Sequence, residues 1–153
     1  MKRAIAAAVV VFATLLVAPT AGAIGVKAAG RQYVRDVASA NAALKTFDSQ
    51  IKTWTNSTAD AEGERQAESV LTTLNALQKN LLNQTWPRVV KGGVRFICEE
   101  DISSLQEDLR EIDNNSSLGN GAFQLTFRED SQTLDSDAFY IRRELGLPES
   151  RAL

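Results

Sequence analysis

The chain has 153 residues, of which 44% are hydrophobic and 24% are charged, with one cysteine, no histidine and a net charge of −2. The lack of histidine excludes Ser-His and Cys-His catalysis, His-based metal sites and the Glu-x-x-His motif of di-iron bundles. A single cysteine excludes an internal disulfide, and the mildly acidic balance gives no global reason to bind nucleic acid or anionic lipid.

Residues 1–23 have the layout of an export signal. Lys2 and Arg3 precede an apolar run, Ala4–Ala18, and small residues at 21–23 form a cleavage site. The apolar run has 15 residues, whereas a membrane-spanning helix needs about 20. We therefore expect this segment to be cleaved after export.

Cleavage leaves residues 24–153 as a single domain, which is long enough to bury a core. This domain carries 15 basic and 19 acidic residues, a net charge of −4. The same signal layout serves bacterial secretion and transfer into the thylakoid lumen, so the signal leaves both compartments open.

The first two helices are predicted from apolar residues spaced three and four apart. The first seam consists of Tyr33, Val37, Ala40, Leu44, Phe47, Ile51 and Trp54. The polar cluster at 56–60 then favours a turn. A second helix is expected from about Asp60 to Trp86, with Glu62 and Glu64 in the first turn, where the helix dipole favours negative charge. Its seam consists of Ala67, Val70, Leu74, Leu77 and Leu81.

Pro87 is expected to start the third helix, because its fixed φ suits the first helical position. The third seam consists of Val90, Val94, Ile97 or Cys98, Ile102, Leu105, Leu109 and Ile112. The loop Asp113–Gly121 is rich in Asn, Ser and Gly. The fourth seam consists of Phe123, Phe127, Leu134, Ala138, Ile141 and Leu145. Gly146 is a predicted C-cap, and Pro148 follows it as a helix breaker.

These segments of about 26 residues, roughly 39 Å long at 1.5 Å per residue, predict an all-α fold. Short polar connections favour an antiparallel up-down-up-down four-helix bundle. Two end clusters are expected in that topology: Trp54 with Ile112 and Phe123, and Tyr33 with Trp86, Val90 and Leu145.

The third helix begins with a row of basic residues, Arg88, Lys91 and Arg95, although a helix dipole prefers acidic residues there. The row is either a docking patch for an acidic partner or a solvated face paired with acids on neighbouring helices. Gly92 and Gly93 follow within the same two turns, at a cost of about 2 kcal/mol relative to alanine. They allow close approach of another backbone, from a partner or from within the bundle.

We expect no catalytic residue, metal site or cofactor. The acidic run Cys98–Asp101 cannot form a calcium loop, because such loops place ligands around a turn that contains glycine. The carboxylate pairs Glu107 with Glu111 and Asp135 with Asp137 have no visible pocket to shift their pKa values. Cys98 is expected to be a small buried residue rather than a redox centre.

The stretch Leu81–Leu105 places Trp86-Pro87 between an apolar-rich helix and a helix with spaced basic residues. In a small exported four-helix bundle, this stretch resembles the PsbQ-type extrinsic subunits of photosystem II. Tyr33–Leu44 is similar to the opening helix of related lumenal proteins, and Ser131–Arg143 to the last helices of the family. Plant members are basic and this chain is acidic, so the resemblance is to an algal-lineage form.

The resemblance implies a non-enzymatic subunit in the thylakoid lumen, peripheral to the membrane. Such a subunit docks on the photosystem II core and other extrinsic subunits and helps to retain calcium and chloride at the oxygen-evolving site. Its predicted docking residues here are Trp86, Arg88, Lys91, Gly92, Gly93 and Arg95. The alternative is a bacterial secreted or periplasmic helical-bundle binding protein that holds a small ligand in its core or at one end.

Overall fold

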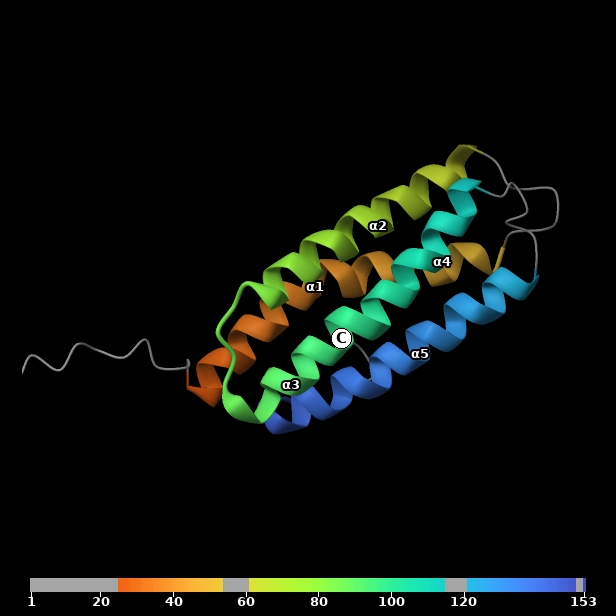
Figure 1. The fold of residues 1–153 in the computed structure, drawn as a ribbon. Helices are drawn as coiled ribbons and strands as arrows, with labels where there is room; N and C mark the ends of the chain where they lie inside the picture. The colour runs from red at the N-terminus through yellow and green to blue at the C-terminus, as the bar shows by residue number, and fades with distance from the viewer. Residues whose placement is uncertain (1–24, 54–60, 115–120, 151–152) are drawn as a thin grey trace, which may run out of the picture.

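The computed structural model describes residues 25–53, 61–114, 121–150 and 153, and these residues form helices and no strand. The elements are α1 (Val26–Ile51), α2 (Ala61–Leu82), α3 (Arg88–Phe96), the π-helical η1 (Ile97–Asp101), α4 (Ile102–Asn114) and α5 (Gly121–Glu144). Because α3, η1 and α4 follow one another without a break, they make one long rod that packs with α1, α2 and α5 (Figure 1). The predicted all-α class and helical bundle are confirmed.

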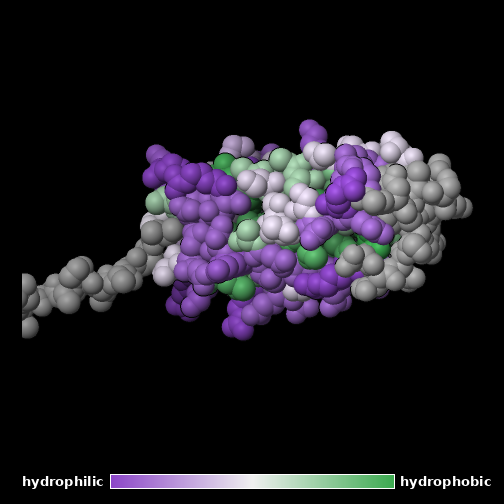
Figure 2. Space-filling view, turned by 90° about the horizontal axis from the view of Figure 1, so that it is seen from above, coloured by the Kyte–Doolittle hydropathy of each residue, from purple (hydrophilic) through white to green (hydrophobic). Residues whose placement is uncertain are grey.

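Each rod turns one apolar row into a shared core, as the periodicity predicts. The most deeply buried large side chains are Tyr33, Phe47, Ile51, Leu74, Leu81, Ile97, Ile102, Leu105, Leu109, Ile112 and Phe127. Leu44 and Phe123 are only half-buried against this core, and Trp54 lies outside the described residues. Figure 2 shows one outer face that is largely hydrophilic, with apolar atoms between the polar ones. Burying each large apolar side chain contributes about 1.5–3 kcal/mol.

Aromatic contacts connect the rods across the core. Tyr33 on α1 meets Trp86 edge to face, with ring centroids 6.2 Å apart. Phe47 and Phe127 make a second edge-to-face contact, with centroids 5.1 Å apart. The first contact agrees with the predicted cluster of Tyr33 and Trp86.

The corner between α2 and α3 differs from its prediction, because α2 ends at Leu82 rather than at Trp86. Trp86 precedes proline, a position that disfavours helical ψ. Its indole N–H donates to the Leu81 carbonyl at 2.7 Å, which satisfies a carbonyl of the last helical turn. Pro87 was predicted to be the first helical residue, but it is the N-cap of α3 (φ −54°, ψ 146°), and the helix itself begins at Arg88.

The π-helical segment η1 explains why both Ile97 and Cys98 are buried, where the spacing left a choice between them. The N–H of Ile102 donates to the Ile97 carbonyl, five residues back, instead of to Cys98. The Cys98 carbonyl accepts from Gln78 Nε2 at 2.5 Å and from Ser103 Oγ at 3.2 Å. This extra residue per turn widens the buried face of the third rod.

The end of α5 has the predicted glycine cap. Gly146 has φ +65°, and the N–H of Leu147 donates to the Arg142 carbonyl at 2.9 Å, which is a Schellman arrangement. Beyond it, the side chain of Leu153 is buried, and its carbonyl oxygen accepts from Asn41 Nδ2 on α1 at 3.2 Å.

The predicted signal segment, 1–23, lies outside the described residues. None of the helices in the described ranges is both long enough and apolar enough to cross a membrane.

Candidate functional site: the exposed face of α3

The three basic residues of α3 are all exposed, and we refer to Arg88, Lys91 and Arg95 as the basic face. Their spacing of three and four places them in one row along the helix. Arg95 Nε binds Glu99 Oε1 at 2.7 Å, and its side chain remains 71% exposed. Within the described part of the chain, neither Arg88 nor Lys91 forms an ion pair. Two of the three charges are therefore available to a partner.

The basic face does not stabilise its own helix. The first turn of α3 contains no acidic residue, and Arg88 and Lys91 lie where the helix dipole carries positive partial charge. Each such placement costs a few tenths of a kcal/mol, about 0.3 or more near an exposed end. No acidic residue of a neighbouring helix offsets this cost by pairing with Arg88 or Lys91 in the described ranges.

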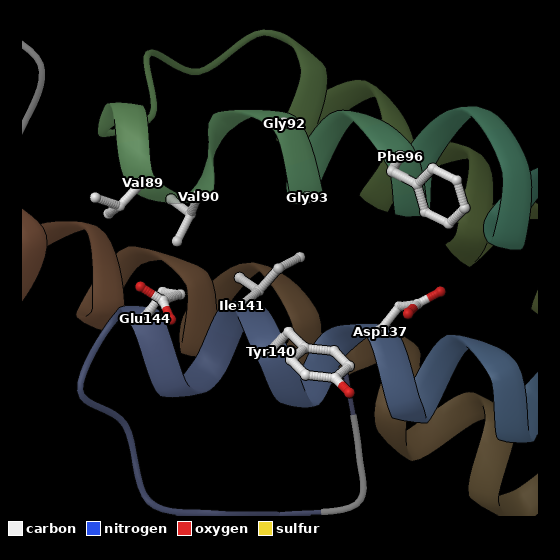
Figure 3. Close-up of a pocket in the computed structure, with 9 residues that line it drawn as sticks. All are labelled: Val89, Val90, Gly92, Gly93, Phe96, Asp137, Tyr140, Ile141 and Glu144. Atoms are coloured by element: carbon white, nitrogen blue, oxygen red, sulfur yellow. The ribbon is translucent and has the colours of Figure 1, made fainter.

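A groove of 230 Å³ lies between α3 and α5 (Figure 3). It adjoins the basic face, because Val89, Gly92 and Phe96 of its lining each directly follow a basic residue in the sequence. Its lining residues are Val89, Val90, Gly92, Gly93 and Phe96 from α3 and Asp137, Tyr140, Ile141 and Glu144 from α5. Three large apolar residues around it are strongly exposed: Val89 at 58%, Phe96 at 51% and Tyr140 at 55%. The groove therefore exposes apolar surface to solvent, although Val90 and Ile141 beneath it are buried in the core.

The two glycines of α3 have different surroundings. A Cβ on Gly93 would lie 3.2 Å from Cγ1 of Ile141, which points from α5 toward α3 in Figure 3. A Cβ on Gly92 would meet nothing within 4 Å. Gly93 therefore allows α3 and α5 to pack closely within the bundle, whereas Gly92 leaves open space at the groove.

Trp86 is the one predicted docking residue that does not lie on this surface. Its side chain is 5% exposed and packs against Tyr33, with its N–H bound to the Leu81 carbonyl. Trp86 therefore fixes the corner from which α3 starts. The other predicted residues, Arg88, Lys91, Gly92, Gly93 and Arg95, are exposed around the start of α3.

A wider hollow of 860 Å³ lies on another side of Tyr140. Its lining is mainly polar: Gln132, Asp135, Ser136, Phe139, Tyr140, Glu149 and Ser150. Small-molecule sites are mostly apolar with a few converging polar groups, so this hollow lacks the expected character.

Two buried aspartates on the η1–α4 rod were not predicted. Asp101 is 6% exposed and Asp108 is 8% exposed, and Oδ2 of each is buried without a hydrogen-bond partner. Asp137 acts on Asp101, and Asp130 acts on Asp108, both from α5. We call these four residues the acidic seam.

The acidic seam changes the protonation of its buried members. Burial raises the pKa of Asp101 to about 7, assisted by the charge of Asp137. Burial and the charge of Asp130 likewise raise the pKa of Asp108 to about 7. Protonation of one carboxyl in each pair supplies the hydrogen-bond donor that the pair otherwise lacks.

The acidic seam, as far as the structure describes it, does not gather the side chains that a metal ion requires. In the described ranges, no three His, Cys, Asp or Glu side chains converge as a metal ion requires. Asp137 lines the groove, whereas Asp101 is buried behind it and is not part of the groove lining. A catalytic carboxyl pair needs both groups within reach of the reacting atoms.

The pattern that places this seam is present in the sequence. Asp101 and Asp108 are seven residues apart on one rod, and Asp130 and Asp137 are seven apart on α5. A seven-residue spacing returns to the same helix face after two turns. Pairing the two faces requires knowing which rods touch, which spacing alone does not provide.

The chain matches no protein-family model, no curated protein and no solved structure. Its function is therefore inferred from the geometry of the α3 surface.

Proposed function

We propose that this protein is a non-enzymatic extrinsic subunit that docks through the basic face of α3 on an acidic surface of a membrane complex. The complex that fits the Leu81–Leu105 resemblance is photosystem II, on its lumenal side. The protein then resides in the thylakoid lumen, peripheral to the membrane, where residues 1–23 are cleaved after export. Bound there, it helps to retain calcium and chloride at the oxygen-evolving site.

The observation that carries this proposal is the pair of unpaired, exposed cations at the start of α3. Arg88 and Lys91 lie at the positive end of a helix and have no ion-pair partner among the described residues. Local stability does not account for them. An acidic partner surface accounts for them, because its carboxylates pair with the Arg88 and Lys91 side chains and with the positive N-terminal end of α3.

The bundle suits this role when its rods alternate in direction, as an antiparallel up-down-up-down arrangement. The positions of facing residues support this arrangement: Gly93 lies against Ile141, and further along the rod Asp101 and Asp108 are affected most, among the residues of α5, by the lower-numbered Asp137 and Asp130. Such a bundle is a rigid body that covers a site and limits its exchange with bulk water. In this role the protein does not itself coordinate the metal ions of the oxygen-evolving site.

The test uses photosystem II membranes stripped of their extrinsic subunits by 1 M NaCl. The wild-type protein is expected to rebind at low salt and to be released again at high salt, where the screening length falls to about 3 Å. The triple variant Arg88→Glu/Lys91→Glu/Arg95→Glu is expected to lose rebinding. Circular dichroism is expected to give the same helical content for both proteins.

A matched control changes the net charge equally at other positions. Lys45, Arg65 and Arg128 are exposed on α1, α2 and α5, and their triple change to Glu is expected to leave rebinding largely intact. Equal loss of rebinding in both triple variants would mean that the net charge of the protein, rather than the basic face, controls docking. Rebinding of the basic-face variant at the wild-type level would make the basic face a solvated surface and refute the proposal.

A further inference from the structure

We propose that the α3–α5 groove holds an amphipathic segment of the docking partner. Apolar side chains of that segment enter the groove, and acidic side chains in the neighbouring row lie over Arg88 and Lys91. This inference rests on the proposed docking function and specifies the chemistry of the partner surface.

An apolar occupant follows from the exposed side chains around the groove. Val89, Phe96 and Tyr140 are each more than half exposed, and they surround one opening rather than being scattered. Aromatic side chains around a pocket are typical of the centres of protein interfaces. Val90 and Ile141 provide an apolar floor.

The position of Gly92 joins the groove to the basic face. Gly92 is one helical turn from Arg88 and one turn from Phe96, so it lies between the basic row and the apolar row. Nothing lies within 4 Å of where its Cβ would be. A partner segment can therefore cross α3 at Gly92 and reach both rows at once.

Charge on the two rims sets the orientation of that segment. The α3 side carries the basic face, and the α5 rim carries Asp137 and Glu144. Glu144 is paired with Arg143 at 3.4 Å, with both side chains exposed. Acidic partner residues are attracted to the two unpaired cations on the α3 side, whereas the α5 rim offers Asp137 and a Glu144 that is already paired with Arg143. The segment therefore places its acidic edge over α3.

A small organic ligand fits this site less well. The groove has a volume of 230 Å³, whereas drug-sized ligands occupy pockets of about 300–1,000 Å³. The groove has room for individual side chains of a longer segment, which is the occupant that also uses the basic face.

The probe variant is Gly92→Leu, because a side chain at this position extends into open space rather than into the core. It fills the groove from α3 while leaving the packing beneath unchanged. Asn75→Leu is the control, since Asn75 is exposed on α2 and receives the same side chain. Thermal unfolding of both variants checks that the bundle remains intact.

Two binding measurements separate this inference from the docking function. The first uses a synthetic helical peptide of about 18 residues, five helical turns, with Leu in one row and Glu in the next. The second uses the salt-stripped photosystem II membranes. A peptide with Lys in place of Glu serves as the charge control.

The wild-type protein and Asn75→Leu are expected to bind the Glu peptide in a salt-dependent way and to reject the Lys peptide. Gly92→Leu is expected to lower affinity for the Glu peptide and for the membranes by about tenfold or more, equivalent to 1.4 kcal/mol. Peptide binding without membrane binding would remove photosystem II as the partner while the groove chemistry stands.

Three results would overturn the groove inference. Unchanged binding by Gly92→Leu in both measurements would leave the basic face as the whole docking site. Failure of the wild-type protein to bind the Glu peptide would exclude an acidic amphipathic occupant. Self-association of the wild-type protein that Gly92→Leu abolishes would assign the groove to a second copy of this chain.

Discussion

Asp101 on η1 and Asp137 on α5 interact as two carboxyls, and the side-chain charges that act on Asp101 are all negative. Asp108 and Asp130 repeat the relationship further along the same two rods. Buried like charges destabilise a fold unless protons neutralise part of them. The acidic seam therefore couples the stability of the bundle to pH.

The first prediction is that the bundle is more stable at pH 5 than at pH 8. The folded state raises the pKa of Asp101 and of Asp108 from 3.8 to about 7. Their stabilising contribution is complete below pH 3.8 and is lost as pH rises through about 7. The midpoint of urea unfolding is therefore expected to fall between pH 5 and pH 8.

Replacing the buried aspartates tests whether they cause this pH dependence of stability. Asp101→Asn and Asp108→Asn remove the titrating group and supply a permanent donor, so each is expected to stabilise the protein by about 1–2 kcal/mol at pH 8. The effect at pH 5 is expected to be small. A pH profile that stays as steep in the double variant would place the titration elsewhere.

The second prediction concerns the core. Phe47 is 1% exposed and Leu74 is 0% exposed. A buried unpaired charge costs several kcal/mol, about 3–5 or more, against a typical total stability of about 5–15 kcal/mol. Phe47→Asp and Leu74→Asp are each expected to abolish most of the helical circular dichroism.

Neighbouring exposed positions provide the controls for the core variants. Thr46 and Asn75 lie next to Phe47 and Leu74 but face solvent, so Thr46→Asp and Asn75→Asp are expected to keep the helical signal. Folded Phe47→Asp and Leu74→Asp proteins would mean that these two rows do not form the core.

The sequence predicts the apolar rows well because helical periodicity is a local property. The seam residues of α2 and of the third rod are all buried as expected. The predicted end of α2, Trp86, was wrong by four residues. The periodic pattern stops before this corner, where Pro87 disfavours a helical conformation of Trp86 and the Trp86 indole binds the Leu81 carbonyl. At the π-helical turn of η1, Gln78 from another rod donates to the Cys98 carbonyl, and the spacing of residues along one rod does not reveal such a contact.

The site was predictable in part for the same reason. Arg88, Lys91 and Arg95 follow one face by spacing alone, and their exposure agrees with it. The groove needed tertiary information, since Tyr140 and Ile141 come from α5. The separate surroundings of Gly92 and Gly93 depend on where Ile141 lies.

The third prediction is that Cys98 reacts slowly with thiol reagents in the folded protein and rapidly in denaturant. Its side chain is 0% exposed, and burial, with the charge of Glu99, raises the pKa of the thiol to about 12. The reactive thiolate is therefore scarce at neutral pH. Rapid labelling under native conditions would mean that η1 opens readily, and Cys98→Ala is expected to keep docking activity.

The fourth prediction compares the two glycines. Gly92→Ala adds helix propensity in open space and is expected to stabilise the bundle by about 1 kcal/mol. Gly93→Ala places a methyl group 3.2 Å from Ile141 Cγ1, so the Ile141 side chain must move slightly and the gain is offset. Urea unfolding of the two variants is expected to rank Gly92→Ala as the more stable. Equal stabilisation would mean that Ile141 yields without cost.

The last prediction ranks the three cations of the basic face. Arg95 is already bound to Glu99 at 2.7 Å, whereas Arg88 and Lys91 have no ion-pair partner among the described residues. A partner must compete with Glu99 for Arg95 but not for the other two. Arg88→Gln and Lys91→Gln are therefore expected to weaken rebinding to photosystem II membranes more than Arg95→Gln does. Glu99→Gln, which frees Arg95, is expected to strengthen rebinding at low salt, where the screening length reaches about 30 Å at 0.01 M. If Arg95→Gln has the largest effect of the three and Glu99→Gln weakens rebinding, then the Arg95–Glu99 pair itself forms the contact with the partner.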